Sequence, residues 1–281
     1  MIAIGYKMAG AVLRRLRRSA EPILELILGS DDFTCPVCGR GVHHFRPLPS
    51  YYQKNLQDAG WPYPLDQAET CNTRHYSCPH CFASDRDRLC VLYLDAYLAP
   101  GGGPKTLVQF APSAPLSRWI QRTIDQRQLL LTYRTADLYA EGVDDRLDIT
   151  DMKAYADGSL DFFICSHVLE HVREDRKALR ELFRVLRPAG CGILLVPIVR
   201  GVEEIDEDPE VTDLRERWRR FGQDDHVRLY SKRDFLERVR EAGFVVNELD
   251  ARHFGPETFE RNGIAPRSVL YLAERPALGN D

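Results

Sequence analysis

Short apolar runs alternate with amphipathic stretches along the last two thirds of the chain. The apolar runs predict strands at 106–110, 129–135, 146–149, 160–165, 192–197, 244–249 and 268–273. Helical spacing of apolar residues predicts helices at 116–124, 175–186, 211–221 and 232–242. Strands that are apolar on both faces and alternate with helices indicate a parallel sheet covered on both sides, so we expect an α/β fold. No helical pattern separates the last two runs, and we expect them to form an antiparallel pair at one end.

A further helix is predicted upstream of the first strand. Residues 85–98 place apolar side chains at helical spacing, and Pro100 with the glycines from Gly101 to Gly103 ends the pattern. We place the boundary between an N-terminal module and the α/β domain at this point.

The first thirty residues have a different character. Five basic residues and two acidic ones give this segment a charge of +3, interleaved with apolar positions and interrupted by Pro22. The pattern predicts an amphipathic helix region over 1–30. Such a helix either packs on protein or makes peripheral contact with an anionic membrane surface.

Composition narrows the function classes. At 281 residues with 44% hydrophobic content, the chain can bury one α/β core and carry a small accessory module. The net charge of −4 gives no strong nucleic-acid signal, because phosphate binding normally uses a basic face. No apolar run approaches the roughly 20 residues that span a bilayer, so a soluble, cytoplasmic protein is expected.

Four cysteines carry the strongest local chemical signal. Cys35 and Cys38 form one Cys-x-x-Cys knuckle, and Cys78 and Cys81 form another about forty residues later. Paired knuckles can hold Zn²⁺ in a closed tetrahedral site, which leaves no position for substrate and is therefore structural. Free thiols are the main alternative, and a disulfide is disfavoured without a secretory signal. Nearby residues that could substitute as ligands are Cys71, His43, His44, His75 and His80.

Three phrases in the second half of the chain resemble a known family. They are LDFFICSHVLEHV from Leu160 to Val172, ALRELFRVLRPAG from Ala178 to Gly190, and ILLVP from Ile193 to Pro197. In this order and spacing they closely resemble the central part of class I S-adenosylmethionine-dependent methyltransferases. The resemblance covers roughly residues 105–275, and the combination with a zinc knuckle resembles a bacterial subgroup.

The resemblance implies a Rossmann-like sheet of seven strands, mostly parallel with an antiparallel last strand. The implied division is an N-terminal helix region at 1–30, a zinc module with its connecting helix at 31–100, and a methyltransferase domain at 101–281. S-adenosylmethionine is the implied cofactor. Residues matching the family's cofactor-binding positions are Phe110, Ala111, Pro112, Asp137, Asp148, Ile149, Thr150, Ser166 and His167.

These matching positions have different implied roles. Asp137 matches the acidic residue that holds the ribose hydroxyls, and Asp148 with the two residues after it matches the loop that contacts adenine. Ser166 and His167 match the end of the fourth strand, near the methionine moiety. One departure is the turn after the first strand, where the family's glycine-rich sequence is replaced by Ala111 and Pro112.

Candidate catalytic residues are His226 and His171. His226 follows the fifth strand next to acidic residues, and a histidine beside a carboxylate can remove a proton from a hydroxyl acceptor. A capping role is the alternative. His167, Glu170 and His171 also fit an inverted zinc-peptidase motif, but that motif needs a helix, and here it follows a buried strand.

The sequence therefore favours a methyltransferase acting on a small-molecule or glycan acceptor, with oxygen as the acceptor atom. One alternative is a ribosomal RNA methyltransferase with a zinc ribbon. The other is a non-catalytic scaffold, motivated by the missing glycine-rich turn.

Overall fold

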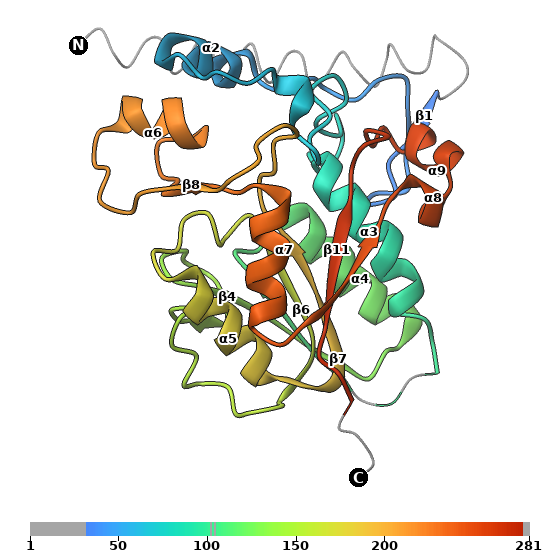
Figure 1. Ribbon diagram of the computed structural model, residues 1–281. Helices are drawn as coiled ribbons and strands as arrows, with labels where there is room; N and C mark the ends of the chain where they lie inside the picture. Colours follow the sequence, from blue (N-terminus) through green and yellow to red (C-terminus); the bar gives the residue numbers. More distant parts are fainter. Residues whose placement is uncertain (1–31, 102, 104, 278–281) are drawn as a thin grey trace, which may run out of the picture.

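The computed structural model describes residues 32–101, 103 and 105–277 (Figure 1). The predicted amphipathic helix over 1–30, and with it the expected membrane contact, lies outside the described residues.

A seven-stranded sheet forms the centre of the described chain. Its strand order is β10-β11-β7-β6-β3-β4-β5, and only β11 runs antiparallel to its neighbours. The Rossmann-like sheet with an antiparallel last strand is thereby confirmed. The seven strands are β3 Lys105–Phe110, β4 Leu131–Asp137, β5 Asp145–Arg146, β6 Leu160–Ser166, β7 Leu186–Leu195, β10 Val245–Leu249 and β11 Leu270–Glu274.

Helices cover both faces of this sheet. Figure 1 shows α5 (Asp175–Val185) and α7 (Lys232–Glu241) together on one face, and α3 (Asp85–Tyr97) and α4 (Ala114–Arg127) on the other. The other helices in the described residues are α2 Ser50–Ala59, the 3₁₀ helix Leu65–Gln67, α6 Leu214–Phe221, α8 Ala251–Phe254 and α9 Pro256–Arg261.

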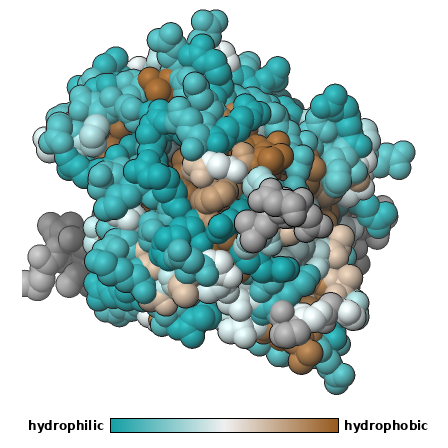
Figure 2. All heavy atoms as spheres, turned by 60° about the horizontal axis from the view of Figure 1, so that its bottom comes forward, coloured by the Kyte–Doolittle hydropathy of each residue, from teal (hydrophilic) through white to brown (hydrophobic). Residues whose placement is uncertain are grey.

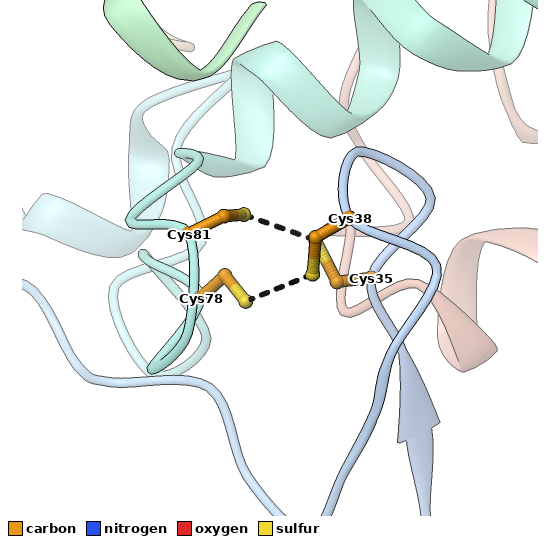
Figure 3. A group of neighbouring side chains, drawn as sticks. All are labelled: Cys35, Cys38, Cys78 and Cys81. Atoms are coloured by element: carbon orange, nitrogen blue, oxygen red, sulfur yellow. Dashed lines mark hydrogen bonds between the residues drawn. The ribbon is translucent and has the colours of Figure 1, made fainter. Parts of the chain in front are cut away.

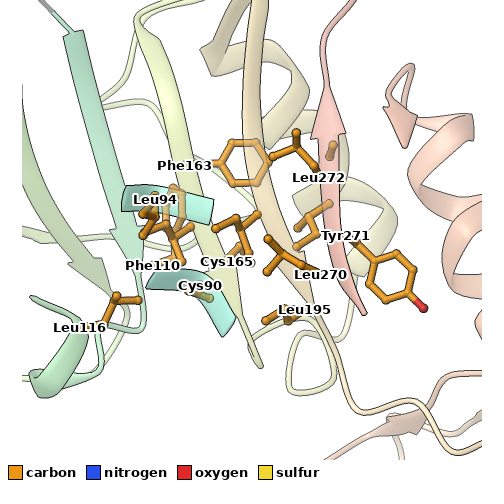
Figure 4. Close-up of a cluster of buried hydrophobic side chains, with 14 of the residues drawn as sticks. Cys90, Leu94, Phe110, Leu116, Phe163, Cys165, Leu195, Leu270, Tyr271 and Leu272 are labelled. Atoms are coloured by element: carbon orange, nitrogen blue, oxygen red, sulfur yellow. The ribbon is translucent and has the colours of Figure 1, made fainter. Parts of the chain in front are cut away.

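The core lies between the sheet and these helices. In Figure 4, Cys90 and Leu94 of α3 pack against Phe110 of β3 and Cys165 of β6. The same buried cluster extends from Cys35 of the first knuckle to residues of β11. Because the N-terminal module and the sheet share one buried cluster, the division at residue 100 stays a prediction.

Short strand pairs order the polypeptide outside the main sheet. β1 (Phe33–Thr34) pairs with β2 (Gly41–Val42) around the first knuckle, and β8 (Asp206–Glu207) pairs with β9 (Arg228–Leu229). We call residues 39–77, which join the two knuckles, the inter-knuckle segment. It runs along the chain that follows β7, where Glu69 N donates to Ile198 O over 2.8 Å and Arg200 N to Gln67 O over 2.9 Å.

Three expectations need correction. Helices α8 and α9 lie between β10 and β11, where none was predicted, because both are too short to show a helical repeat. β5 ends at Arg146 rather than at Ile149, since the Asp148 carboxylate accepts Thr150 N and turns the chain. α6 begins at Leu214 rather than at Val211, because the Asp213 side chain caps it by accepting Glu216 N.

The surface turned forward in Figure 2 is mostly hydrophilic, and its hydrophobic residues form several separate groups. Among the described residues, we find no helix with the length and apolar character needed to cross a membrane.

Candidate active site

The matched cofactor positions lie along one edge of the sheet. Phe110 pairs with Ala136 on one side and with Cys165 on the other, so the turn after β3 lies between the ends of β4 and β6. Asp137 ends β4 and Ser166 ends β6. In parallel sheets ligands bind outside the carboxyl ends of the strands, and the predicted residues gather at that edge.

The turn after β3 has a glycine-like backbone without a glycine. Ala111 has φ of 46°, in the left-handed region, and its N–H donates to Ala136 O over 2.9 Å. Ser113 then caps α4 by accepting Leu116 N, and Pro115 lies in the first turn of that helix, where proline is tolerated. The chain therefore turns sharply at Ala111 and enters α4 at once.

Two carboxylates lie on the β4 and β5 side of this turn. Asp137 Oδ1 accepts the backbone N–H groups of Tyr139 over 2.7 Å and Ala140 over 2.8 Å. Its half-buried side chain is thereby fixed at the end of β4. Asp148 is exposed, whereas Ile149 and Thr150 behind it are buried. Asp137 at the end of β4 and Asp148 in the loop after β5 both lie at the sheet edge where the cofactor was expected.

A cavity of about 430 Å³ opens beside the ends of β6 and β7. This volume is within the range of small-molecule sites, about 300–1,000 Å³. Its walls come from the inter-knuckle segment, the start of α3 and the chain between β7 and β9. The aromatic residues that line it are Tyr51, Tyr52, Tyr76, Trp61, Trp218 and Phe221, and its cationic or titratable residues include Arg86, His167 and His226.

Ring and hydrogen-bond contacts hold the roof of this cavity. The Tyr52 hydroxyl donates to Gly222 O over 3.0 Å, and the Tyr52 and Trp218 rings are 5.3 Å apart in an edge-on arrangement. Helix α2 is thereby joined to α6, and two segments far apart in sequence enclose one space.

A buried glutamate organises the histidines at the floor of the cavity. Glu170 is fully buried, and its Oε1 lies 3.0 Å from His167 Nδ1 and 4.0 Å from His171 Nε2. Burial alone would raise the pKa of Glu170, but the nearby histidines, His167 first, lower it to about 2. Burial lowers the pKa of His167 to about 4, with Arg86 acting in the same direction, so this imidazole is neutral at pH 7.

His226 and His171 lie together next to this glutamate. Their ring centroids are 4.7 Å apart, and His226 Nδ1 donates to Phe221 O over 3.0 Å. His226 therefore keeps an unprotonated Nε2. Its pKa is lowered by burial, partly offset by Glu170. Of the two predicted catalytic histidines, His226 lines the cavity.

The four knuckle cysteines converge from two similar turns (Figure 3). The Sγ atoms of Cys35 and Cys81 are 3.7 Å apart, and those of Cys38 and Cys78 are 3.9 Å apart. All four sulfurs lie within 4.8 Å of one another. A regular tetrahedron with Zn–S bonds of about 2.3 Å has sulfurs about 3.8 Å apart, so these distances fit that ion.

The sequence did not reveal the cavity wall. Tyr52, Trp61 and Arg86 precede the recognisable domain, and nothing in their spacing indicated that they face the sheet edge. The concentration of aromatic residues between the two knuckles is the feature of the sequence that indicates this wall.

Comparison with known proteins shows that the central part of the chain is similar to methyltransferases. Residues 96–194 match the family model described as a methyltransferase domain. A human thiol S-methyltransferase is 52% identical over 40 residues, which is 14% of this chain and 16% of that protein. The matched part is thus a small share of that relative's length.

Solved structures with similar folds share little sequence with this chain. An S-adenosylmethionine-dependent methyltransferase from Archaeoglobus fulgidus is 12% identical with a TM-score of 0.42, covering 67% of this chain and 94% of its own. The carbon methyltransferase DszA is 16% identical with a TM-score of 0.43, covering 69% and 53%. The [4+2]-cyclase SpnF is 16% identical with a TM-score of 0.42, covering 68% and 81%.

Proposed function

We propose, from the premise that this chain carries a class I S-adenosylmethionine-dependent methyltransferase domain, that it methylates an oxygen atom of a small-molecule or glycan acceptor. The observation that carries the proposal is the aromatic cavity that adjoins the cofactor edge of the sheet and contains His226. Aromatic walls with a few polar groups suit an organic ring or a sugar.

The sheet edge supplies the cofactor site in this proposal. Bound S-adenosylmethionine supplies an electrophilic methyl group on its sulfonium. Asp137 accepts hydrogen bonds from ribose hydroxyls, and Ala111 and Pro112 allow backbone to approach the ligand. Phe110 lies behind that turn, and Ile149 and Thr150 flank the adenine side beside Asp148. Ser166 and His167 border the methionine side.

Methyl transfer is a displacement in line with the breaking C–S bond, so the main task of the protein is alignment. The cavity walls hold the acceptor hydroxyl and exclude water. His226 accepts the hydroxyl proton at Nε2, since its Nδ1–H is held by Phe221 O. Glu170 then stabilises the protonated imidazole, and His171 is the next candidate for the proton.

A structural zinc ion completes the proposal. Cys35, Cys38, Cys78 and Cys81 provide four thiolates at tetrahedral spacing, and no ligand position is left for substrate. The ion joins the two ends of the inter-knuckle segment. Because this segment forms part of the cavity wall, zinc supports the acceptor site without taking part in the reaction.

The experiment that tests the acceptor class uses S-adenosylmethionine with a trideuterated methyl group. The full chain is incubated with a mixture of metabolites, oligosaccharides and ribosomal RNA fragments, and mass spectrometry locates the label. The proposal requires the label on oxygen of a small molecule or glycan, and requires much less of it with the His226→Ala variant. Label on RNA, on nitrogen or on carbon would contradict it.

A further inference from the structure

The side of the cavity next to His226 is apolar. The His226 side chain is only 4% exposed, and its Nδ1 donates to Phe221 O. Phe221, Val199 and Leu229 form a buried cluster of their own, against which Trp61 packs. All four of these apolar residues line the cavity. An acceptor that reaches the His226 imidazole therefore lies against hydrocarbon side chains.

The carboxylate and amide side chains that line the cavity are exposed or already engaged. Among the lining residues that the structure describes, Asp224 is the one carboxylate, and it is exposed. The two amides are those of Asn55, which is exposed, and Gln223, whose Nε2 donates to Asp225 Oδ1 over 2.9 Å. A sugar ring brings several hydroxyls that each need a partner once water is removed. The wall beside His226 offers few such partners.

A tightly packed tryptophan gives the cavity a flat aromatic surface. Gly222 ends α6 with φ of 83°, and a Cβ at this position would lie 3.2 Å from the Trp61 ring. The Trp61 ring is also edge-on to the Tyr63 ring, with 5.1 Å between the two centroids. Trp61 is thus held between Gly222 and Tyr63. A ring held in this way can pair with a planar aromatic ligand at a centroid distance of about 4.5–7 Å.

The basicity of His226 limits which hydroxyl it can deprotonate. Burial lowers the pKa of this imidazole, partly offset by Glu170. Proton transfer to a base becomes unfavourable when the pKa of the proton donor is far above that of the base. The pKa of a phenol is about 10, as in tyrosine, whereas that of water, which an aliphatic hydroxyl resembles, is about 16. A phenol is therefore a better match to His226 than an alcohol or a sugar.

We infer that the methyl acceptor is a phenol, whose planar ring packs beside Trp61 and whose hydroxyl reaches His226 Nε2. The inference rests on the proposed function and narrows its acceptor class. As the hydroxyl proton passes to Nε2, an electron pair of the phenol oxygen forms the new C–O bond to the methyl carbon. The C–S bond breaks and its electron pair stays on sulfur. The products are an aryl methyl ether and S-adenosylhomocysteine, and the imidazole then releases its proton to water.

Binding of two matched ligands tests the ring contact without turnover. Naphthol has an aromatic ring system, and decahydronaphthol has the same carbon skeleton without aromaticity. Calorimetry measures the affinity of the full chain for each ligand in the presence of S-adenosylhomocysteine. Trp61→Leu should weaken naphthol binding more than decahydronaphthol binding, by about 2- to 10-fold, because aromatic pairs contribute beyond their buried area.

Two further variants separate this contact from a change in folding. Trp61→Phe keeps an aromatic ring and should retain most of the preference for naphthol. Phe254→Leu removes an aromatic ring from α8, outside the cavity, and should change neither affinity.

Turnover by the wild type tests the hydroxyl. The kcat/KM for methylation of naphthol should exceed that for decahydronaphthol or methyl glucoside by at least about 100-fold, since naphthol alone has an acidic hydroxyl. Mass spectrometry identifies the methyl ether.

Three outcomes would overturn the inference. Naphthol that does not bind, or that binds without being methylated, would do so. Methylation of decahydronaphthol or methyl glucoside at a similar or higher kcat/KM would remove the phenol and leave the proposed function standing. Equal losses for both ligands in Trp61→Leu would assign the effect to the shape of the cavity. Absence of S-adenosylhomocysteine binding by the wild type is a different failure, because it would remove the proposed function itself.

Discussion

At the residue scale, two non-glycine residues in left-handed backbone mark the ends of neighbouring strands. Ala111 follows β3 with φ of 46°, and His167 follows β6 with φ of 57°. Each such residue lowers the stability of the fold by about 1–2 kcal/mol relative to glycine. Residues in this strained conformation recur at functional sites. The turn after β3 therefore has the shape that a glycine would give, which weakens the case for a non-catalytic scaffold.

His226 carries the sharpest prediction at this scale. His226→Ala should lower the methyl-transfer rate by roughly 10²–10⁴, because the general base is lost, and should leave the affinity for S-adenosylhomocysteine nearly unchanged. Rate and binding are measured on the same preparation. Full activity of the variant at neutral pH would return His226 to a structural role and leave His171 and His167 as candidates.

The pH profile gives an independent check on the same residue. Burial lowers the pKa of His226, while Glu170 acts against this and His171 reinforces it. The imidazole is thus neutral at pH 7, and the rate should fall with acid only at a pH below the ordinary imidazole value of about 6.5. Loss of rate at or above that value would contradict the assignment.

At the element scale, the buried carboxylate of Asp175 joins α5 to α7 and to the chain at β9. Asp175 at the start of α5 accepts the Tyr230 hydroxyl over 2.5 Å and Arg238 Nη1 of α7 over 2.6 Å. Arg228 of β9 lies 3.8 Å from the same carboxylate and donates to the carbonyl of Leu169. These contacts hold the loop after β6 against the chain that closes the cavity.

Asp175→Ala should therefore be destabilising. Its loss leaves the buried guanidiniums of Arg228 and Arg238 with Glu207 as their remaining carboxylate partner and leaves the Tyr230 hydroxyl without its acceptor, which costs about 1–3 kcal/mol in unfolding free energy. Denaturant unfolding measures this value. The control Asp58→Ala breaks the exposed pair with Lys54 and should change stability by less than about 1 kcal/mol. Similar effects of the two substitutions would contradict the role of Asp175.

The long elements could be predicted from sequence, because burial imposes a period on them. β3, β6 and α5 match their expected ranges closely, since each has a continuous buried run or stripe. β8 and β9 have two residues each, and their pairing depends on contacts distant in sequence. For the same reason the strand ends at the proposed cofactor edge were predictable, whereas the cavity wall formed by Tyr52 and Arg86 was not.

At the scale of the whole molecule, the two knuckles connect the proposed zinc site to the proposed acceptor cavity. The two turns are alike: Gly39 N donates to Cys35 O over 2.8 Å, and Phe82 N to Cys78 O over 3.0 Å. The inter-knuckle segment between them contributes cavity residues from Leu48 to Tyr76. A metal that fixes the two turns would also fix the ends of this wall.

We expect one tightly bound Zn²⁺ per chain, measured by elemental analysis of the purified protein. Cys38→Ser should lose the metal and lower the unfolding free energy by several kcal/mol, because metal binding supplies folding energy in such modules. Cys191→Ser, outside the cluster, should keep the full metal content. Metal-free wild type with an intact N-terminal module would contradict the zinc site.

Binding of S-adenosylhomocysteine tests most directly whether this chain is an S-adenosylmethionine-dependent methyltransferase. Isothermal titration of the wild type should give one ligand per chain at the carboxyl edge of the sheet. Asp137→Ala should weaken binding by about 1–3 kcal/mol, the scale of hydrogen bonds to a charged group, and Asp137→Asn should keep the loop contacts and lose part of that energy. Wild-type protein that binds no S-adenosylhomocysteine would contradict the assignment of this chain as a methyltransferase.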